Sequence, residues 1–215
     1  MLVTTNLAVA NLMSVIRLTA PERRAAIIAA AINLFAEKGF RGVTTRELAQ
    51  AVGVSEPVLY DHFPSKRDLY NALMDSMAAS SRELFGNRYM PKDDGTRSDR
   101  DFFIGVASTI IEWHERNPAY VRLFLFSALE GHELGERFFH RHSSTFLDEL
   151  AGCIRSRIES GRFRPVDPTL AAYHFMGIVG HHGVNCAMAE KGKPTTPRTE
   201  VIESIVDLFL KGVQA

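Results

Sequence analysis

The apolar residues of this chain recur at helical spacing along most of its length. Between Pro21 and Lys38, for example, Ile27, Ala31 and Phe35 stand four residues apart, which is typical of a helix with one buried face. Similar stripes predict helices over about residues 66–85, 101–116, 118–131, 143–160, 168–189 and 199–212. Strand-like alternation is rare. The pattern therefore predicts an all-α chain of about nine helices arranged in two lobes.

Residues 44–69 predict two short helices joined by a tight turn, with a further helix starting after them. Either residue of the pair Thr44-Thr45 can cap the first helix, and Glu47 completes a capping box if Thr44 is the cap. Gly53 ends this helix, because glycine adopts the left-handed conformation at little cost. Ser55 then caps the second helix.

The second of these helices presents its outer side to a partner. Leu59 and Phe63 lie four residues apart and bury against the preceding helix, which leaves most of residues 56–62 at or near the surface. Helix-turn-helix proteins enter the major groove of DNA with the N-terminal half of such a helix. The sequence thus predicts a DNA-binding motif.

Glycines, caps and aromatic residues fall in register at Gly39-Phe40, Thr44-Thr45, Ala49–Val54, Ser55, Leu59-Tyr60, His62-Phe63 and Ser65-Lys66. Over residues 21–69 the chain resembles the DNA-binding segment of the tetracycline-repressor (TetR) family of bacterial transcription regulators. The resemblance implies three parts: an N-terminal extension (1–20), a helix-turn-helix DNA-binding domain (21–67), and a regulatory domain for ligand binding and dimerisation (68–215).

The resemblance also implies a function. We expect a homodimeric repressor that binds double-stranded DNA at a palindromic operator and leaves it when a small, mainly apolar effector binds. By carry-over from the family, Thr45, Tyr60 and Lys66 contact phosphates. The whole set expected at the DNA is Thr44, Thr45, Arg46, Ser55, Glu56, Pro57, Val58, Tyr60, His62 and Lys66.

The last two predicted helices, residues 168–189 and 199–212, carry the expected dimer contacts. Gly177, Gly180 and Gly183 recur every three residues, and each costs about 0.5–1 kcal/mol relative to alanine, which indicates a close approach to that backbone. The following helix has a broad apolar stripe. The expected interface is Gly177, Gly180, Gly183, Val201, Ile202, Ile205 and Phe209. Alternatively, the glycines make room for an internal helix or a ligand.

The middle helices carry an aromatic stripe that is expected to line an effector cavity, since the family encloses one there. Trp113, His114, Tyr173 and His174 supply polar groups to orient a ligand in an apolar cavity. The alternative for any one residue is ordinary core packing. The expected contacts are Phe103, Ile110, Trp113, His114, Phe124, Leu147, Tyr173 and His174.

Composition adds little to this picture. Lys+Arg and Asp+Glu are equal at 25 each, so no overall basic field attracts nucleic acid and affinity must come from local contacts. Cys153 and Cys186 fit buried thiols of a reducing cytosol. The N-terminus lacks the basic start of a secretory signal, and residues 169–189 are too polar for a membrane span. We expect a cytoplasmic protein without membrane contact.

Metal and enzyme chemistry are not indicated. Among the histidines, His140 and His142 point to different helix faces, and His181 and His182 diverge by about 100°, so no metal or cofactor is expected. No nucleophile elbow, phosphate-binding glycine loop or zinc-protease motif is present, which argues against an enzyme. The rival hypothesis is a small-molecule-binding protein whose DNA-binding lobe has lost its use.

Overall fold

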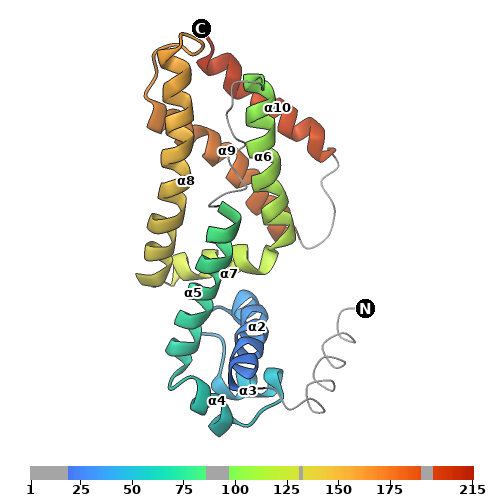
Figure 1. Ribbon diagram of the computed structural model, residues 1–215. Coiled ribbons are helices and arrows are strands. Elements are labelled where there is room, and N and C mark those ends of the chain that lie inside the picture. Colours follow the sequence, from blue (N-terminus) through green and yellow to red (C-terminus); the bar gives the residue numbers. More distant parts are fainter. Residues whose placement is uncertain (1–18, 86–96, 131–132, 190–195) are drawn as a thin grey trace. The chain divides into compact units, whose positions relative to one another are not determined.

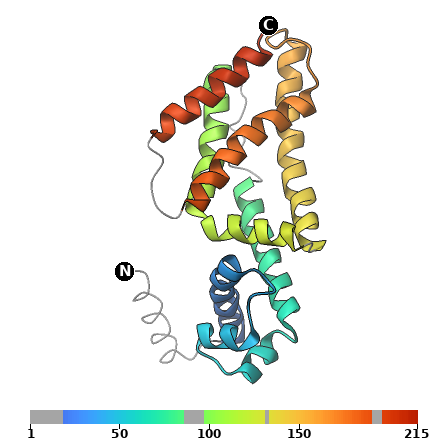
Figure 2. The ribbon, with the colours of Figure 1, turned by 180° about the vertical axis from the view of Figure 1, so that it is seen from behind.

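The computed structural model describes residues 19–85, 97–130, 133–189 and 196–215, with the backbone alone over 78–85 and 133–144. Within these ranges it contains nine α-helices and no β-strand (Figures 1 and 2). The predicted all-α class is therefore confirmed. Of the extension predicted over residues 1–20, all but Thr19 and Ala20 lies outside the described residues.

The chain packs as two compact units. We call residues 1–77 with 122–135 the helix-turn-helix unit, and residues 78–121 with 136–215 the C-terminal unit. The division falls inside three helices, α5 (Lys66–Phe85), α7 (Pro118–Leu129) and α8 (Glu133–Glu159). The helix-turn-helix unit thus includes a segment from the middle of the chain. The boundary expected between the DNA-binding and regulatory domains, between residues 67 and 68, stays a prediction.

Three helices open the helix-turn-helix unit: α2 (Ala20–Lys38), α3 (Thr45–Val52) and α4 (Glu56–His62). Helix α2 packs against α3, and α3 packs against α4. Their inward faces meet in a dry core, because almost no surface of the following side chains is exposed: Ile27, Phe35, Leu48, Leu59 and Phe63. This burial is the main favourable term that holds three short helices together.

The C-terminal unit is built from α6 (Asp99–Arg116), α8 (Glu133–Glu159), α9 (Pro168–Met188) and α10 (Arg198–Val213). Helix α9 runs beside α6, and α10 packs against both (Figures 1 and 2). Aromatic rings fill the centre: Phe103 lies 5.0–6.1 Å, between ring centroids, from Phe102, Phe163, Phe175 and Phe209. None of the helices in the described ranges combines the length and the apolar content that a membrane span requires.

Helix α8 differs from the sequence-based expectation. It begins at Glu133, whereas the apolar pattern predicted a start at about residue 143. Residues 133–142 hold only Leu134, Phe138 and Phe139 as large apolar residues among charged residues, histidines and Gly135, so their apolar stripe is short. Once a helix has formed, each added residue gains a backbone hydrogen bond, so the helix extends beyond its amphipathic part.

A buried arginine ties the start of α6 to the end of α8. The side chain of Arg157 is fully buried, and its Nε donates to the Asp99 carboxylate at 2.7 Å. Its Nη1 donates to the Cys153 carbonyl at 3.0 Å, and the guanidinium lies 4.3 Å from the centre of the Phe102 ring. The exposed Arg162 reaches the same Asp99 oxygen at 3.0 Å. Because a buried charge is costly without its partner, this pair fixes α6 against α8.

Asp99→Ala should destabilise the C-terminal unit by about 3–5 kcal/mol, since it leaves the Arg157 charge buried without its carboxylate. Arg162→Ala is the matched control and should cost less than about 1 kcal/mol, as expected of an exposed ion pair. Urea unfolding followed by the fluorescence of Trp113, the single tryptophan, which lies in this unit, measures both. Equal losses for the two variants would contradict this role of Arg157.

Candidate nucleic-acid interface

The start of α3 is fixed by a capping box. The Thr44 hydroxyl accepts from the Glu47 backbone N–H at 3.2 Å, and the Glu47 carboxylate accepts from the Thr44 backbone N–H at 2.8 Å. Thr44 is therefore the cap, as the first alternative expected. Lys38 donates to Glu47 at 2.6 Å, and this bond, with those from Thr44, lowers the pKa of Glu47 to about 2. The Glu47 carboxylate of the capping box is therefore ionised throughout the physiological pH range.

A tight turn connects α3 to α4. Gly53 takes the left-handed conformation, with φ of 74°, and its N–H donates back to α3, which confirms the expected helix end. Ser55 stands at the N-cap of α4 with extended backbone, but its side chain makes no capping hydrogen bond. Pro57 lies in the first turn of α4, where its missing N–H leaves no helical bond unmade.

The faces of α3 and α4 divide as predicted. Leu48 and Leu59 are buried in the core, while Tyr60 is 43% exposed. Of the ten residues expected at DNA, five are exposed and five are half-buried. Thr44, Arg46, Ser55, Pro57 and Tyr60 are exposed, and Thr45, Glu56, Val58, His62 and Lys66 are half-buried.

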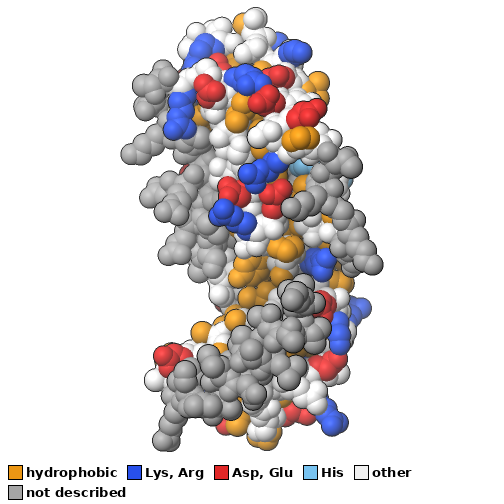
Figure 3. Space-filling view, turned by 90° about the vertical axis from the view of Figure 1, so that its right-hand side faces the viewer, with side chains coloured by type: hydrophobic (Ala, Val, Ile, Leu, Met, Phe, Trp, Pro, Cys, Tyr) orange, Lys and Arg blue, Asp and Glu red, His pale blue; other side chains and the backbone are white. Residues whose placement is uncertain are grey.

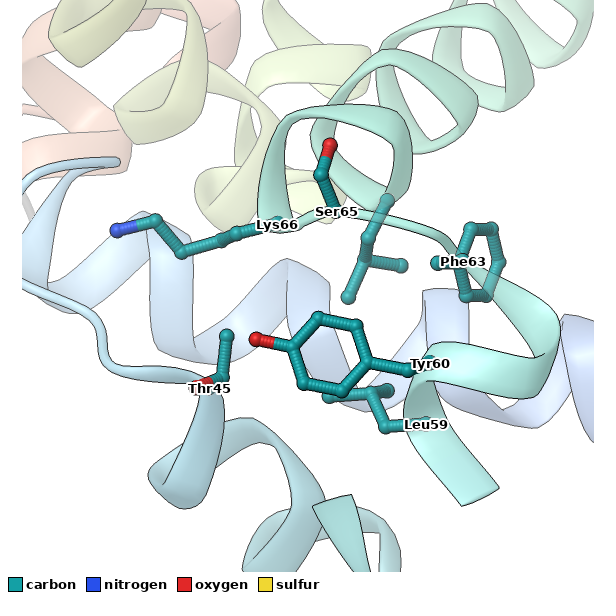
Figure 4. A pocket seen from close by; sticks show the side chains of 7 residues that line it. Thr45, Leu59, Tyr60, Phe63, Ser65 and Lys66 are labelled. Atoms are coloured by element: carbon teal, nitrogen blue, oxygen red, sulfur yellow. The ribbon is translucent and has the colours of Figure 1, made fainter. Parts of the chain in front are cut away.

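A shallow recess lies between the starts of α3 and α5 and the side of α4. Its lining is Thr45, Leu59, Tyr60, Phe63, Ser65, Lys66 and Leu69 (Figure 4). The hydroxyl of Tyr60 points toward Thr45 across the mouth of the recess. Thr45 in turn donates from Oγ1 to the Glu56 carboxylate at 3.1 Å, which joins the first residues of α3 and α4. The recess thus places two hydroxyl groups beside a helix N-terminus, where backbone N–H groups favour an anion.

Lys66 takes a different direction from the one expected. Its ammonium donates to the carbonyls of Phe40 at 2.9 Å and Val43 at 2.7 Å, and it lies 4.4 Å from the centre of the Phe40 ring. In Figure 4 the side chain extends away from Tyr60. A phosphate contact by Lys66 stays a prediction, whereas its bonds to the α2–α3 loop are a structural role that the sequence did not suggest.

Sequence reasoning missed two further contacts of this unit. Arg24 places its guanidinium 4.4 Å from the centre of the Phe63 ring. Glu130, which follows α7, accepts from the backbone N–H of Phe40 at 3.0 Å and of Arg41 at 3.2 Å. No local pattern joins these residues, because the partners stand on separate elements and Glu130 is about ninety positions from the loop.

Charge does not mark the interface. The formal net charge of the chain is zero. On the face shown in Figure 3, the described Lys and Arg side chains are interspersed with Asp and Glu side chains. Electrostatic attraction over a distance is therefore weak, and specific contacts must supply the affinity.

The residues expected to bind an effector do not form one lining. Phe103, Ile110 and Leu147 are buried in the hydrophobic core of the C-terminal unit. Tyr173 and His174 lie on the outer face of α9, with Tyr173 52% exposed. Phe124 belongs to the helix-turn-helix unit. Tyr173 and His174 precede the inward-facing Phe175 on the same helix, and successive residues of a helix point about 100° apart. Their contact with an effector stays a prediction.

Trp113 and His114 remain together, with ring centroids 5.2 Å apart. His114 Nδ1 lies 2.8 Å from the Ile110 carbonyl, and burial lowers the pKa of this histidine. Because a carbonyl only accepts, we assign the hydrogen to Nδ1, which leaves Nε2 as an acceptor. A Cβ on Gly183 would stand 2.6 Å from the His114 ring, so this glycine serves internal packing.

The other residues expected at the dimer interface fall into two groups, glycines with open space beside them and apolar residues packed within the unit. Gly177 and Gly180 have open space where a Cβ would stand. Ile202, Ile205 and Phe209 are buried within the unit, and Val201 packs against its core. The apolar stripe of α10 therefore belongs to the monomer, because α10 buries it against α6 and α9.

An apolar groove remains on the outer side of α9 and α10. Its volume is about 420 Å³, and Leu208 in its lining is 67% exposed. The lining is Arg164, Val166, Asp167, Leu170, Ala171, His174, Ile178, Leu208, Phe209, Gly212 and Val213. Among the described residues, no group of His, Cys, Asp and Glu side chains is placed to hold a metal ion. His132, His140 and His142 lie outside the described side chains.

Two family models match the chain. Residues 27–73 match the bacterial regulatory proteins of the tetR family, and residues 109–212 match the C-terminal domain of AefR-like transcriptional repressors. The transcriptional regulator RutR of Escherichia coli K12 is 24% identical over 203 residues, covering 89% of this chain and 91% of RutR. The nucleoid occlusion factor SlmA of Haemophilus influenzae is 29% identical over 166 residues, covering 74% of this chain and 73% of SlmA.

Solved structures share the fold. A TetR-family regulator from Mesorhizobium loti superposes with a TM-score of 0.69 at 21% identity, covering 93% of this chain and 100% of that one. KstR2 of Mycobacterium tuberculosis, a ketosteroid transcriptional regulator, gives 0.66 at 20% identity, covering 90% and 95%. The first family model covers the helix-turn-helix, and the second covers most of the helical C-terminal unit. The chain therefore belongs to the TetR family of transcription regulators.

Proposed function

We propose that this protein is a homodimeric repressor in the cytoplasm that binds a palindromic operator and releases it when a small, mainly apolar molecule binds the C-terminal unit. The observation that carries the proposal is the outward face of α3 and α4 with its recess at two helix starts. A similar structure is that of AibR in complex with isovaleryl coenzyme A and operator DNA. This similarity supports a regulator whose DNA binding responds to a small molecule.

The recess suits a DNA phosphate. The hydroxyls of Thr45 and Tyr60 flank it, and the N-terminus of α3 adds backbone N–H groups and a favourable dipole. We assign phosphate binding to these groups, with the Thr45 hydroxyl exchanging the Glu56 carboxylate for a phosphate oxygen on binding and Lys66 acting through the loop it supports. Such contacts position a protein on DNA without reading its sequence.

Base reading falls to the exposed and half-buried side chains beside the recess. Arg46 pairs well with guanine in the major groove, and His62 can bond to a purine edge. Pro57 and Val58 are apolar and contact thymine methyl groups. Thr44, Ser55 and Glu56 complete the surface at the two helix starts. The operator half-site is therefore expected to contain both thymine and purine positions.

The dimer seam is assigned to the groove on α9 and α10. Exposed Leu170, Tyr173, Ile178 and Leu208 form an apolar surface that a second copy would cover. Gly177 stands among them with open space above its backbone, which admits a close helix contact. A two-fold axis there would present two recognition helices to half-sites about 34 Å apart.

The effector is assigned to the surroundings of Trp113 and His114. Because burial keeps His114 neutral and Nδ1 is engaged, Nε2 is available to a ligand that donates an O–H or N–H. The effector lowers operator affinity only to the extent that it binds more tightly to the dimer geometry that no longer fits DNA than to the geometry that does. A coupling of ~1–3 kcal/mol corresponds to a ~5–150-fold change in affinity.

Tyr60→Phe should weaken binding of all DNA sequences by about tenfold, because it removes one hydrogen bond to a charged phosphate. Arg46→Ala should instead change the preferred half-site while non-specific binding stays near the wild-type value. Fluorescence anisotropy with the selected operator and with single-base variants separates the two effects. Arg155→Ala, an exposed arginine of α8 in the C-terminal unit, is the control. A changed sequence preference in Tyr60→Phe would contradict the assignment.

Leu208→Glu should give monomers, since it places a charge in the apolar seam at a side chain that the monomer leaves exposed. Analytical sedimentation measures the mass, and operator affinity should fall with it because the second half-site is lost. Leu129→Glu, at a leucine of the helix-turn-helix unit that is even more exposed, serves as the control for the sedimenting mass. A Leu208→Glu variant that sediments as a dimer would place the seam elsewhere.

Binding of an effector should quench the single tryptophan and lower operator affinity together. A panel of steroids, flavonoids and acyl coenzyme A thioesters follows the ligand classes named for similar structures. His114→Phe keeps a ring but removes the acceptor, so the affinity of the active compound should fall about two- to tenfold. Quenching without any effect on operator binding would contradict the coupling.

A further inference from the structure

The loop between α2 and α3 is held from outside by a carboxylate far along the chain. Glu130 accepts from the backbone N–H of Phe40 at 3.0 Å through one oxygen and of Arg41 at 3.2 Å through the other. All three residues belong to the helix-turn-helix unit. Hydrogen bonds to an ionised carboxylate are about twice as strong as those between neutral groups.

The backbone of the loop is shaped for this contact. Gly39 has φ of 69°, and a Cβ there would stand 2.7 Å from a Glu130 carboxylate oxygen and 3.0 Å from the Phe126 ring. Any other residue would meet both a strained conformation and a clash. The glycine thus allows the end of α7 to approach the end of α2 closely.

The opposite side of the same loop is held by Lys66. Its ammonium donates to the carbonyls of Phe40 and Val43. The peptide groups around Phe40 are therefore bound by an anion at the N–H side and by a cation at the C=O side. Thr44, the cap of α3, follows directly, so the two charged groups fix where α3 begins.

We propose that Glu130 is a positioning residue for the DNA interface, which holds the α2–α3 loop so that Thr45 and the start of α3 fit a phosphate. The inference rests on the proposed function and adds a positioning residue to its site. Glu130 directly follows α7, whose last residues belong to the helix-turn-helix unit, as does the loop.

Glu130→Gln tests the inference, because it keeps the shape but replaces the carboxylate by an amide that offers one acceptor and one donor. Hydrogen exchange should accelerate at the amides of Phe40 and Arg41 and stay unchanged in the core of α2. Operator affinity should fall about tenfold, with the melting temperature within a few degrees of the wild type. Glu37→Gln, an exposed carboxylate at the end of α2, is the matched control and should resemble the wild type.

Gly39→Ala is a second variant and should reproduce the lower operator affinity by pushing Glu130 away from the loop. Unchanged exchange at Phe40 and Arg41 in Glu130→Gln, or operator binding equal to that of Glu37→Gln, would overturn the inference alone. Exchange that accelerates uniformly through α2–α5 would also overturn it, because Glu130 would then serve only stability. If the wild-type chain selects no DNA sequence, both the inference and the proposed function fall.

Discussion

The helix-turn-helix unit depends on how the backbone polar groups between α2 and α3 are satisfied. A short loop beside a packed core cannot leave these groups without partners, since each such group costs free energy comparable to a lost hydrogen bond. Here Glu130 takes two N–H groups and Lys66 takes two carbonyls. The start of α3, and with it the recess at Thr45, follows from this arrangement. Two charged side chains that bind the loop from opposite sides therefore shape the surface to which we assign DNA binding.

The C-terminal unit follows a different constraint. Its aromatic centre and the Arg157–Asp99 pair fix α6, α8, α9 and α10 as one body. Helix α9 shows the consequence most clearly. Phe175 and Val179 are buried on its inner face, whereas Tyr173 and Ile178 are exposed on the outer one. A helix that is apolar on both faces needs a second covering surface, which in our proposal is another copy of the chain.

Features made by sequence neighbours were predictable. The Thr44–Glu47 box and the Gly53 turn depend on residues at most a few positions apart, and the structure confirms both. Lys66 was not predictable, because its carbonyl partners are 23 and 26 residues away. The three glycines of α9 could not be sorted by spacing alone. Gly177 and Gly183 stand six residues apart, which places them about 120° apart around the helix, one outward and one against His114.

Selection of bound fragments from a random pool of double-stranded DNA measures whether the chain recognises a DNA sequence as a dimer. We expect enrichment of an inverted repeat whose half-sites are centred about one helical turn apart, bound by two copies of the chain with strong salt dependence. Enrichment of no sequence, or binding that is equally tight for every fragment, would contradict a dimeric sequence-specific regulator.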